Sequence, residues 1–385
     1  MKLLCVYYTH KPGGFCKRLY RLMNALVARG HVVHYCCLDK APASLSTSVV
    51  QRRIPFPLRT RNGLLFWLLF TTWCPLYLIG ASLRVRPDAF FVFGAYYAGM
   101  LRLARIITPR PLTLFLRSLV FRIDEINDKP RALRSISNFV DRAGILSATQ
   151  VVCMTKTMQS ELEHFFKLRL TNVAILPNDA PTPSQNRERT DENSLGIFEK
   201  LHEQLAECKL VVLTSGVIDR RKNIEYLLEV FETLVHQPEP HAAMLLIAGD
   251  GPLLQKFKQF AAERSLSNVE FLGWCDSLDA VYPFVDLVVH PALHEGVPNS
   301  VLEALAANIP VLCADTPEMR EVLRMPELFF DTKNSQSLTS RLQAILESPS
   351  DNLGRLTVAS AKAAEHLRFD WDQQSCRLVE QSTER

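Results

Sequence analysis

Two glutamates bracket an uncharged stretch late in the chain, in the sequence HEGVPNSVLEALAANIP. Glu295 and Glu303 are separated by seven residues, none of which carries a charge. A carboxylate accepts hydrogen bonds from hydroxyl groups. Two carboxylates at this spacing can therefore hold two parts of one polar ligand, provided that the local structure turns both toward it.

The residues between the two acids predict the start of a helix. SVLEALAA has the composition of a helix, and Asn299 just before it is a predicted N-cap. The first turn of a helix offers free backbone N–H groups and a positive dipole end, which together suit a phosphate. A nucleoside diphosphate sugar fits this pattern, with Glu303 on its ribose and Glu295 on its transferred sugar. The alternative is that Glu303 caps the first turn and Glu295 is a solvated loop residue.

A basic loop precedes this stretch. After the apolar run KLVVLT come Ser215 and Gly216, and then the cations Arg220, Arg221 and Lys222. Positioned cations stabilise negative charge that develops in a transition state, so these three could neutralise a departing diphosphate. The alternative is a basic surface loop before a helix.

Strand and helix patterns alternate through both halves of the chain. Short apolar runs predict buried parallel strands, and longer amphipathic segments predict helices between them, the first ending at Gly30. The predicted strands are 2–9, 32–38, 89–94, 112–116, 150–155, 172–178 and 209–216, followed by the runs AAMLLIA, NVEFLGW, DLVVHPA and PVLCA; a further helix is predicted around 278–284. This order is typical of two Rossmann-like, doubly wound α/β domains, with the ligand in a cleft beyond the carboxyl ends of the strands.

A polar, proline-bearing segment, PTPSQNRERTDEN, separates the two series. We therefore expect an N-terminal acceptor domain at 1–180, a linker and entry segment at 181–208, and a C-terminal nucleotide-sugar-binding domain at 209–367.

Charge is distributed unevenly. Residues 1–130 carry 19 Lys and Arg against 5 Asp and Glu, a balance of +14, so the remainder carries −10 within the net charge of +4. The first part is either solvated basic surface or a surface that faces polyanions, such as anionic lipid headgroups or a phosphorylated acceptor. No nucleic-acid-binding motif is present, so nucleic acid is not an expected partner.

An apolar stretch without charge runs from Asn62 to Leu83, with arginines before and after it. Its 22 residues are long enough to cross a bilayer. Pro75 and the Thr71–Thr72 pair argue against a simple span, and a crossing here would split the predicted sheet. The remaining interpretations are a helix that docks in the plane of a membrane and a plain core helix.

The ten cysteines are scattered, and none forms a Cys-x-x-Cys pair, so the sequence predicts no metal site. Several lie in apolar runs, where cysteine acts as a small core residue. No signal peptide is evident at Met1–Leu4, so we expect a cytoplasmic protein, peripheral on the inner face of the membrane.

Five blocks resemble, in the same order, the retaining GT-B glycosyltransferases of family 4. They are VVCMTKTMQSEL…VAILPND, SGVIDRRKNIEYLLEVF, LLIAGDGPL, VEFLGW and HEGVPNSVLEALAANIPVL, the last resembling the family's Glu-x7-Glu signature. The resemblance is specific over 209–323 and looser over 1–181. The ending FDWDQQSCRLVEQ is similar to the family's last helix, so we expect residues 368–385 to pack back on the N-terminal domain.

The resemblance implies a GT-B fold and metal-independent transfer of a hexose from a UDP- or GDP-sugar with retention of configuration, without a further cofactor. It implies that Lys222, Arg221 and Glu295 serve catalysis. The implied donor-binding residues are Gly13, Gly14, Ser215, Gly216, Arg220, Gly296, Val297, Pro298, Asn299, Ser300 and Glu303.

The sequence departs from the family pattern at two places. Val217 stands where the family usually has an arginine, and Arg220 or Arg221 would have to substitute for it. Arg117 stands where many members have a sugar-contacting histidine, and Ser118 follows it in place of the aspartate of one subset. We name no general base, since the leaving phosphate can take the acceptor proton; Arg117 is a candidate ligand of the acceptor.

Three functions therefore stay open. The first is a membrane-associated glycosyltransferase that acts on an anionic, lipid-linked or polysaccharide acceptor. The second is a non-catalytic subunit that binds nucleotide sugar, and the third is a nucleotide-sugar epimerase. The sequence gives no indication of the oligomeric state.

Overall fold

The computed structural model of the chain divides into two compact units, each described here by itself. It describes residues 1–10, 13–40, 42–181, 205, 208–235, 242–275 and 277–383. The first unit comprises Met1–Asp124, Lys129–Leu176 and Asp370–Arg385, and the second comprises Glu125–Asp128 and Pro177–Phe369. Apart from residues 181, 205 and 208, the predicted linker 181–208 lies outside the described residues.

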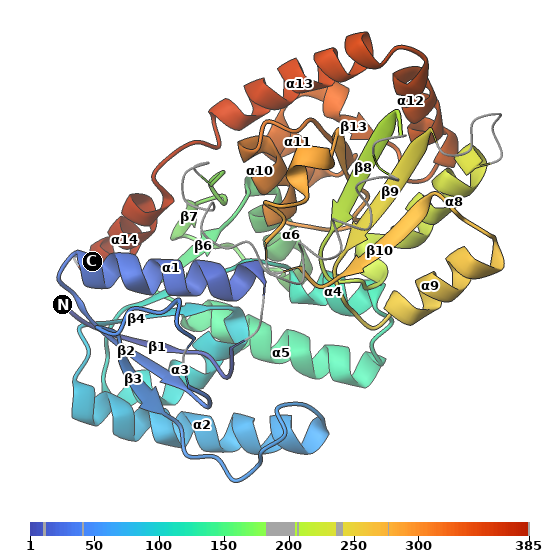
Figure 1. Cartoon of the computed structure of the whole chain (residues 1–385). Coiled ribbons are helices and arrows are strands. Elements are labelled where there is room, and N and C mark those ends of the chain that lie inside the picture. The colour runs from blue at the N-terminus through green and yellow to red at the C-terminus, as the bar shows by residue number, and fades with distance from the viewer. Residues whose placement is uncertain are drawn as a thin grey trace. The chain divides into compact units, whose positions relative to one another are not determined.

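The first unit is built on a seven-stranded parallel sheet with the strand order β3-β2-β1-β4-β5-β6-β7 (Figure 1). Apart from the two edge strands at 50–53 and 173–175, its strands are short, mostly apolar runs that are buried, as expected where helices cover a parallel sheet. The strands are β1 (Lys2–Val6), β2 (Val32–Cys37), β3 (Val50–Arg53), β4 (Ala89–Phe93), β5 (Leu112–Phe115), β6 (Gln150–Cys153) and β7 (Val173–Ile175).

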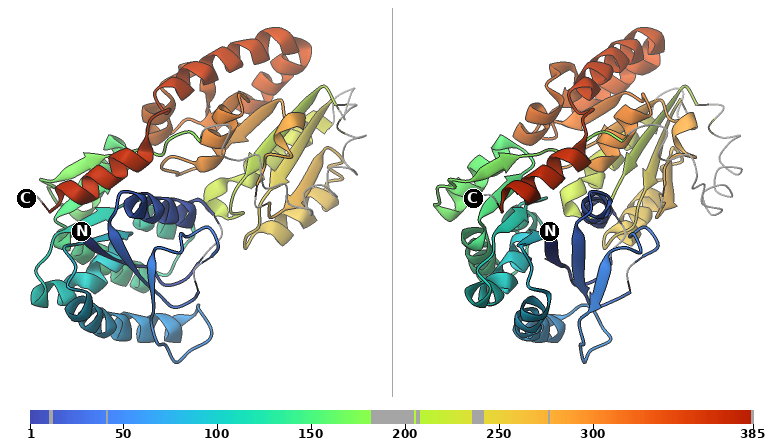
Figure 2. Two further views of the ribbon diagram at one scale, coloured as in Figure 1. Left: turned by 60° about the vertical axis from the view of Figure 1, so that its left-hand side comes forward. Right: turned by 90° about the vertical axis from the view of Figure 1, so that its left-hand side faces the viewer.

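The helices of this unit connect successive strands, and one returns from the end of the chain. They are α1 (Gly14–Ala28), α2 (Leu64–Val85), α3 (Ala95–Ile107), α4 (Val120–Ile126), α5 (Arg131–Ser147), α6 (Lys156–Phe166) and α14 (Trp371–Gln381). Helix α3 packs against both α2 and α5, and α14 lies beside α1 (Figure 2). Arg29 Nε donates to Glu380 at 2.8 Å, and Trp371 is fully buried, so the last helix is anchored on the first.

The second unit is built on a six-stranded parallel sheet with the order β10-β9-β8-β11-β12-β13. Its strands are β8 (Leu210–Ser215), β9 (Ala243–Ala248), β10 (Val269–Gly273), β11 (Leu287–His290), β12 (Val311–Ala314) and β13 (Phe329–Phe330). Its helices are α8 (Ile224–Val235), α9 (Leu254–Glu263), α10 (Asn299–Ala306), α11 (Pro317–Leu323), α12 (Ser335–Glu347) and α13 (Pro349–Glu365), with short 3-10 turns η2 (Arg220–Lys222), η3 (Tyr282–Phe284) and η4 (Pro326–Leu328).

Both sheets reverse their strand order beside the first strand of the unit. In the second unit, β8 lies between β9 and β11, so the chain winds outward from β8 in both directions. In doubly wound sheets, ligands bind at the carboxyl ends of the two strands where the order reverses. The loops that follow β8 and β11 are therefore the first place to look for a site.

The structure corrects three local expectations. The segment around 278–284 forms only the 3-10 turn η3 rather than a helix. Strand β3, with the sequence VQRR, was not predicted. Helix α2 is not a plain core helix, because only 28% of its most apolar 18-residue window is buried, although its length and composition alone would suit a membrane span.

Candidate active site

The two loops at the reversal point of the second sheet carry most of the residues that the sequence singled out. The loop after β8 contains Gly216 and leads into η2, which consists of Arg220, Arg221 and Lys222. The loop after β11 leads from His290 to α10 and carries Glu295. Because β8 and β11 are hydrogen-bonded neighbours, their carboxyl ends bring the two loops together.

Glycines allow the loops to approach so closely. Gly216 has a φ of 137°, which L side chains rarely adopt, and a Cβ there would lie 2.8 Å from Lys222 Cε. A Cβ at Gly249, after β9, would clash with the backbone of Gly216, and one at Gly251 would clash with the backbone of Ile218. The Gly-Asp-Gly turn thus packs the loop after β9 against the loop after β8 and fixes the position of Lys222.

Four ionisable side chains form one cluster at this point. Lys222 Nζ lies 2.9 Å from one Glu295 carboxylate oxygen, and Arg221 Nη1 donates to both Glu295 oxygens at 2.8 Å. Asp219 lies 3.5 Å from Arg221 and also caps η2 by accepting a hydrogen bond from the Lys222 backbone N–H. Two cations and two carboxylates therefore balance one another within the chain.

Burial and charge shift the pKa values of this cluster. Burial alone would raise the pKa of Glu295, but Lys222 and Arg221 outweigh it and lower that pKa to about 2. Burial and the neighbouring Lys222 lower the pKa of His290 to about 3, so this imidazole is neutral at pH 7. Arg221 Nε and His290 Nε2 are buried and have no hydrogen-bond partner among the described residues.

Helix α10 begins one residue earlier than predicted. Asn299 is its first residue rather than its N-cap, and the capping position belongs to Pro298, which makes no side-chain cap. The Asn299 side chain is engaged elsewhere, because its Oδ1 accepts a hydrogen bond from Asn178 Nδ2 at 3.1 Å. The same Asn178 nitrogen donates to the Val297 carbonyl at 2.8 Å, so this buried residue ties down the loop before the helix.

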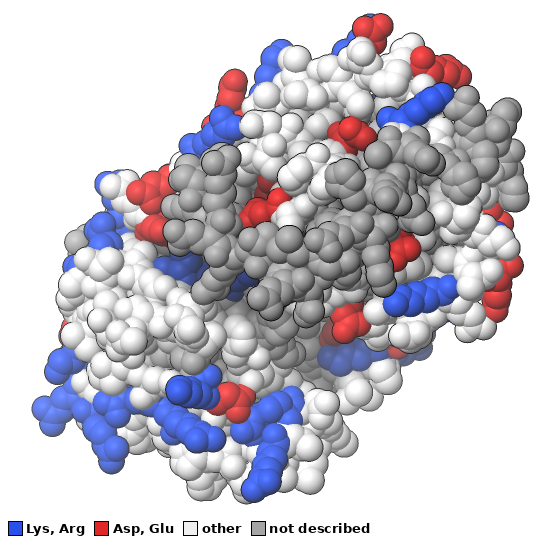
Figure 3. Space-filling model, viewed as in Figure 1, with Lys and Arg blue, Asp and Glu red and all other residues white. Residues whose placement is uncertain are grey.

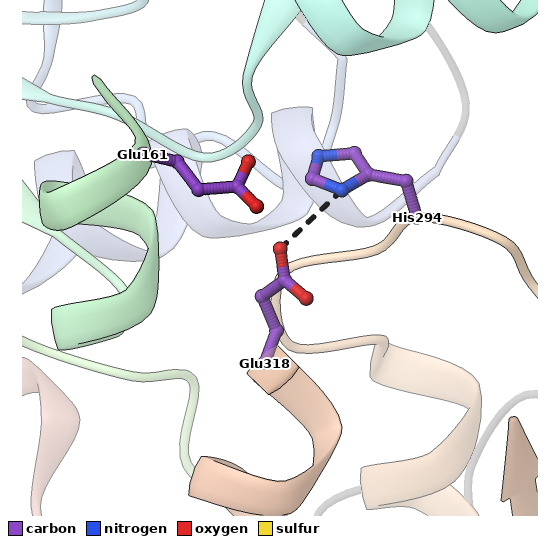
Figure 4. A group of neighbouring side chains, drawn as sticks. All are labelled: Glu161, His294 and Glu318. Carbon is purple, nitrogen blue, oxygen red and sulfur yellow. Dashed lines mark ion pairs between the residues drawn. The ribbon is translucent and has the colours of Figure 1, made fainter. Parts of the chain in front are cut away.

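Two further acids, Glu303 and Glu318, lie on the two helices that follow β11, α10 and α11. Glu303 is the fifth of the eight residues of α10, where its charge adds to burial in raising the pKa of Tyr282. Glu318 of α11 is buried, and His294 Nδ1 lies 3.4 Å from its Oε1 (Figure 4). Burial raises the pKa of Glu318, but His294 lowers it below its usual value, so this pair ties the loop between β11 and α10 to the start of α11.

Comparisons with known proteins show the family to which the chain belongs. The family model of group 1 glycosyl transferases matches residues 198–363, and that of the glycosyl transferase 4-like domain matches residues 13–179. The chain belongs to the group 1 glycosyltransferase family. The match to group 1 covers the loops after β8 and β11, and the second match covers most of the first unit.

Curated relatives are distant. An uncharacterized glycosyltransferase of Methanocaldococcus jannaschii is 24% identical over 58% of this chain, and a second one is 26% identical over 48%. These matches span 57% and 44% of the lengths of those relatives. The O-antigen chain mannosyltransferase B of Escherichia coli is 23% identical over 68% of this chain and 67% of its own length.

Solved structures show that the fold is GT-B. Sucrose-phosphate synthase from Thermosynechococcus elongatus aligns with a TM-score of 0.79 at 16% identity, over 100% of this chain and 98% of its own. The glycosyltransferase WaaG aligns with a TM-score of 0.72 at 17% identity, over 98% and 99% of the two chains. HepE from Anabaena, solved with UDP and glucose, aligns with a TM-score of 0.73 at 16% identity over 99% of both chains.

Of the other predicted site residues, Arg220 belongs to the second unit and Arg117, Gly13 and Gly14 belong to the first. Arg220 is exposed and pairs with Asp128 rather than with the cluster. In the first unit, Arg117 packs between aromatic rings, with Cζ 5.9 Å from the centres of both Phe93 and Trp371. Gly13 is the N-cap of α1, with a φ of 117°, and Gly14 is its first residue.

Sequence reasoning missed two residues that organise the site. Asn178 follows β7, and its two partners stand 119 and 121 positions further along the chain, so no local pattern links them. His290 ends the predicted strand DLVVHPA and was not assigned a role. His290 could have been found from its position, since it is a polar residue at the carboxyl end of a strand beside the point where the strand order reverses.

Proposed function

We propose that the chain is a retaining glycosyltransferase that moves a hexose from a nucleoside diphosphate sugar, UDP- or GDP-linked, to a lipid-linked or polysaccharide acceptor in surface glycan assembly. The observation that supports this most is the buried cluster of Lys222, Arg221 and Glu295 beside the uncapped start of α10. Relatives named as an O-antigen mannosyltransferase and a lipopolysaccharide glucosyltransferase support the class of acceptor.

In this proposal, Lys222 binds the diphosphate, and Glu295 holds the side chain of Lys222 in position. An ammonium group has three donors. One is directed at Glu295, which leaves two for phosphate oxygens. The unpartnered Nε of Arg221 and the first-turn amides of α10 supply further donors to the same anion. Glu303 would accept hydrogen bonds from the ribose hydroxyls.

The balance of charge fits a leaving group rather than a permanently bound anion. Glu295 and Asp219 already offset both cations, so the cluster is close to neutral before a donor binds. Charge that grows on the diphosphate as the sugar departs then meets preorganised donors in a buried site, where such interactions are strongest. The acceptor proton would pass to the leaving phosphate on the same face, which needs neither a metal nor a separate base and gives retention.

The same proposal places the protein on the cytoplasmic side of a membrane as a peripheral enzyme. Nucleotide sugars are water-soluble donors, whereas a lipid-linked acceptor lies at a bilayer surface. A chain with a basic first part and an exposed apolar helix, α2, suits that situation.

Turnover of labelled UDP- and GDP-sugars by the Lys222→Ala variant tests the proposal. We expect kcat to fall by about 10²–10³-fold, with a smaller rise in KM, because the missing donor acts mainly on charge in the transition state. Exposed Lys256 of α9, whose ion pair with Glu225 of α8 is solvated, provides the control variant Lys256→Ala, which should turn over normally.

The outcomes separate the proposed enzyme from its alternatives. Nucleotide-sugar binding without transfer or hydrolysis in the wild-type protein would favour a non-catalytic subunit. Conversion of the donor without any acceptor would favour an epimerase. Nuclear magnetic resonance of the anomeric proton in the product decides between retention and inversion.

A further inference from the structure

Helix α2 presents apolar side chains on two opposite faces. One face packs into the first unit and consists of Phe66, Phe70, Cys74 and Leu78, each at most 1% exposed. The other face is open and follows helical spacing, with Leu65, Leu68, Leu76 and Leu83 between 55% and 61% exposed. An amphipathic helix of a soluble protein would carry polar residues on the second face.

Three polar side chains of α2 make hydrogen bonds within the chain. The hydroxyl groups of Thr71 and Thr72 donate to the backbone carbonyls of Trp67 and Leu68. Trp73 Nε1 donates to the carbonyl of Pro55 at 2.7 Å. Side chains that already have hydrogen-bond partners do not need water, so the outer face of α2 can leave water at little cost.

The neighbouring helices extend this apolar surface. Fourteen of the twenty-two large apolar side chains that are exposed in the described residues lie on α2, α3 and α5. On α3 they are Leu103, Ile106 and Ile107, and on α5 Ile136 and Phe139 are 61% and 75% exposed. Because α3 packs against both other helices, the three form one layer, called here the α2–α3–α5 face. Scattered apolar residues are ordinary on a surface, but a concentration of this size marks an interaction site.

Charge on this layer has one sign. Helices α2 and α3 contain no Asp or Glu, and the only acid on α5, Asp141, is buried. Lys and Arg side chains crowd the lower edge of Figure 3, where Figure 1 places α2 and β3. The exposed arginines on these three helices and their caps are Arg84, Arg86, Arg102, Arg131 and Arg142.

We propose that the α2–α3–α5 face docks on an anionic lipid bilayer, with its apolar side chains in the outer hydrocarbon and its arginines among the headgroups. Apolar area and attraction to anionic lipid add in this mode of binding. This inference rests on the proposed function, because docking would bring the enzyme to a lipid-linked acceptor. Vesicle binding is nevertheless measured independently of sugar transfer.

Two other arrangements fit less well. A transmembrane α2 would have to detach from the first unit, where its inner face packs on β1 and α3. The strands before and after it in the chain, β3 and β4, both belong to the sheet of that unit. A symmetric dimer would place the same surface of two copies face to face. It would then oppose arginines to arginines, with no exposed acid on these helices to pair with them.

Cosedimentation of the full chain with vesicles tests the proposal. Vesicles of phosphatidylglycerol with phosphatidylcholine should bind the wild-type protein at least about tenfold more strongly than phosphatidylcholine alone. The variant Leu68→Glu/Leu76→Glu should lower binding by at least about tenfold, and Ile136→Glu/Phe139→Glu should lower it several-fold. Val358 of α13 is 58% exposed in the second unit, so Val358→Glu is a matched control that should bind as the wild type does.

Both double variants replace exposed side chains, so their circular dichroism and melting temperature should match the wild type and exclude unfolding as the cause. Equal binding to neutral and anionic vesicles, or wild-type binding by Leu68→Glu/Leu76→Glu, would overturn the proposal. A wild-type dimer that this variant converts to a monomer would identify a second copy as the occupant instead. A protein that binds vesicles but shows no thermal shift with UDP- or GDP-sugars would refute the proposed function and leave the docking face standing.

Discussion

The loops after β8 and β11 and the α2–α3–α5 face depart from ordinary burial in opposite directions. At the loops, Lys222, Glu295 and His290 are polar groups withdrawn from water, with exposed side-chain fractions of 10%, 19% and 3%. On the helical face, leucines that are more than half exposed meet water directly. Ionised residues are rarely buried without partners, and large apolar patches are rarely left open. Each departure is tolerated because a neighbour compensates for it: ion pairs in the first case, and a membrane in our proposal for the second.

The two regions should respond differently to substitution. The charged cluster depends on every member, because removing one leaves another buried charge unpaired. The helical face depends on no single member for folding, since its side chains already lie in water in the isolated protein. Substitutions in the cluster should therefore alter stability, and substitutions on the face should alter binding only.

Replacement of Glu295 should give the largest loss of stability. In Glu295→Gln, Lys222 loses its buried counter-ion and Arg221 loses the nearer of its two, and we expect the free energy of unfolding to fall by roughly 3–5 kcal/mol. Urea unfolding followed by circular dichroism measures the change. Glu225→Gln is the control, because the exposed pair of Glu225 and Lys256 should contribute no more than about 1 kcal/mol. Equal effects of the two variants would mean that the cluster is as solvated as the surface pair.

The neutral imidazole of His290 predicts a pH dependence. Its pKa is lowered from 6.5 in the unfolded chain to about 3 in the folded chain, so between these values the unfolded state binds one more proton. Stability contributed by His290 is therefore fully present above pH 6.5 and is lost as the pH falls toward 3. The loss should amount to about 1.4 kcal/mol per pH unit within this window.

Urea midpoints of the wild type and of His290→Gln at several pH values between 7 and 4 isolate this contribution. The difference between the two proteins should change with pH, because only the wild type carries the shifted imidazole. Parallel pH profiles would show that the pKa of His290 is the same in the folded and the unfolded protein, and the lowered pKa assigned to it here would be wrong.

Asn178 tests how the loop before α10 is held. Asn178→Ala removes both hydrogen bonds to the loop, and we expect stability to fall by about 1–3 kcal/mol, with a rise in KM for the donor as the amides of α10 lose their position. Asn352→Ala is a matched control, since Asn352 Nδ2 also donates to a backbone carbonyl, that of Ala344, at 2.7 Å. The control should lose stability and keep its KM. A KM unchanged in Asn178→Ala would reduce Asn178 to an ordinary structural residue.

The periodicity of apolar residues was sufficient to predict most of the fold. It could not predict which charged side chains pair with one another. Apolar runs and loops with glycine predicted the strands that form the centres of both sheets, but β3 escaped because VQRR at a sheet edge has no buried stripe. The two glutamates and the basic loop were expected to meet at one helix start. Their mutual pairing was not expected: Arg221 and Lys222 were assigned to a diphosphate, whereas within the chain both bind Glu295. A buried cation requires a counter-charge whether or not a substrate is present, and the distance of 74 positions between Arg221 and Glu295 hides that pairing from the sequence.

The smallest effect on stability should come from substitutions on the α2–α3–α5 face. Leu68 is 58% exposed, so Leu68→Ser removes little buried area and should change the free energy of unfolding by no more than about 0.5 kcal/mol. Leu78, ten residues further along the same helix, is fully buried, and Leu78→Ser should cost more than about 2 kcal/mol. Urea unfolding of the two variants, made in the same helix with the same chemical change, measures the contrast directly. Similar losses would mean that both faces of α2 are buried in solution by the chain itself or by a second copy, and the open face on which the docking proposal depends would not exist.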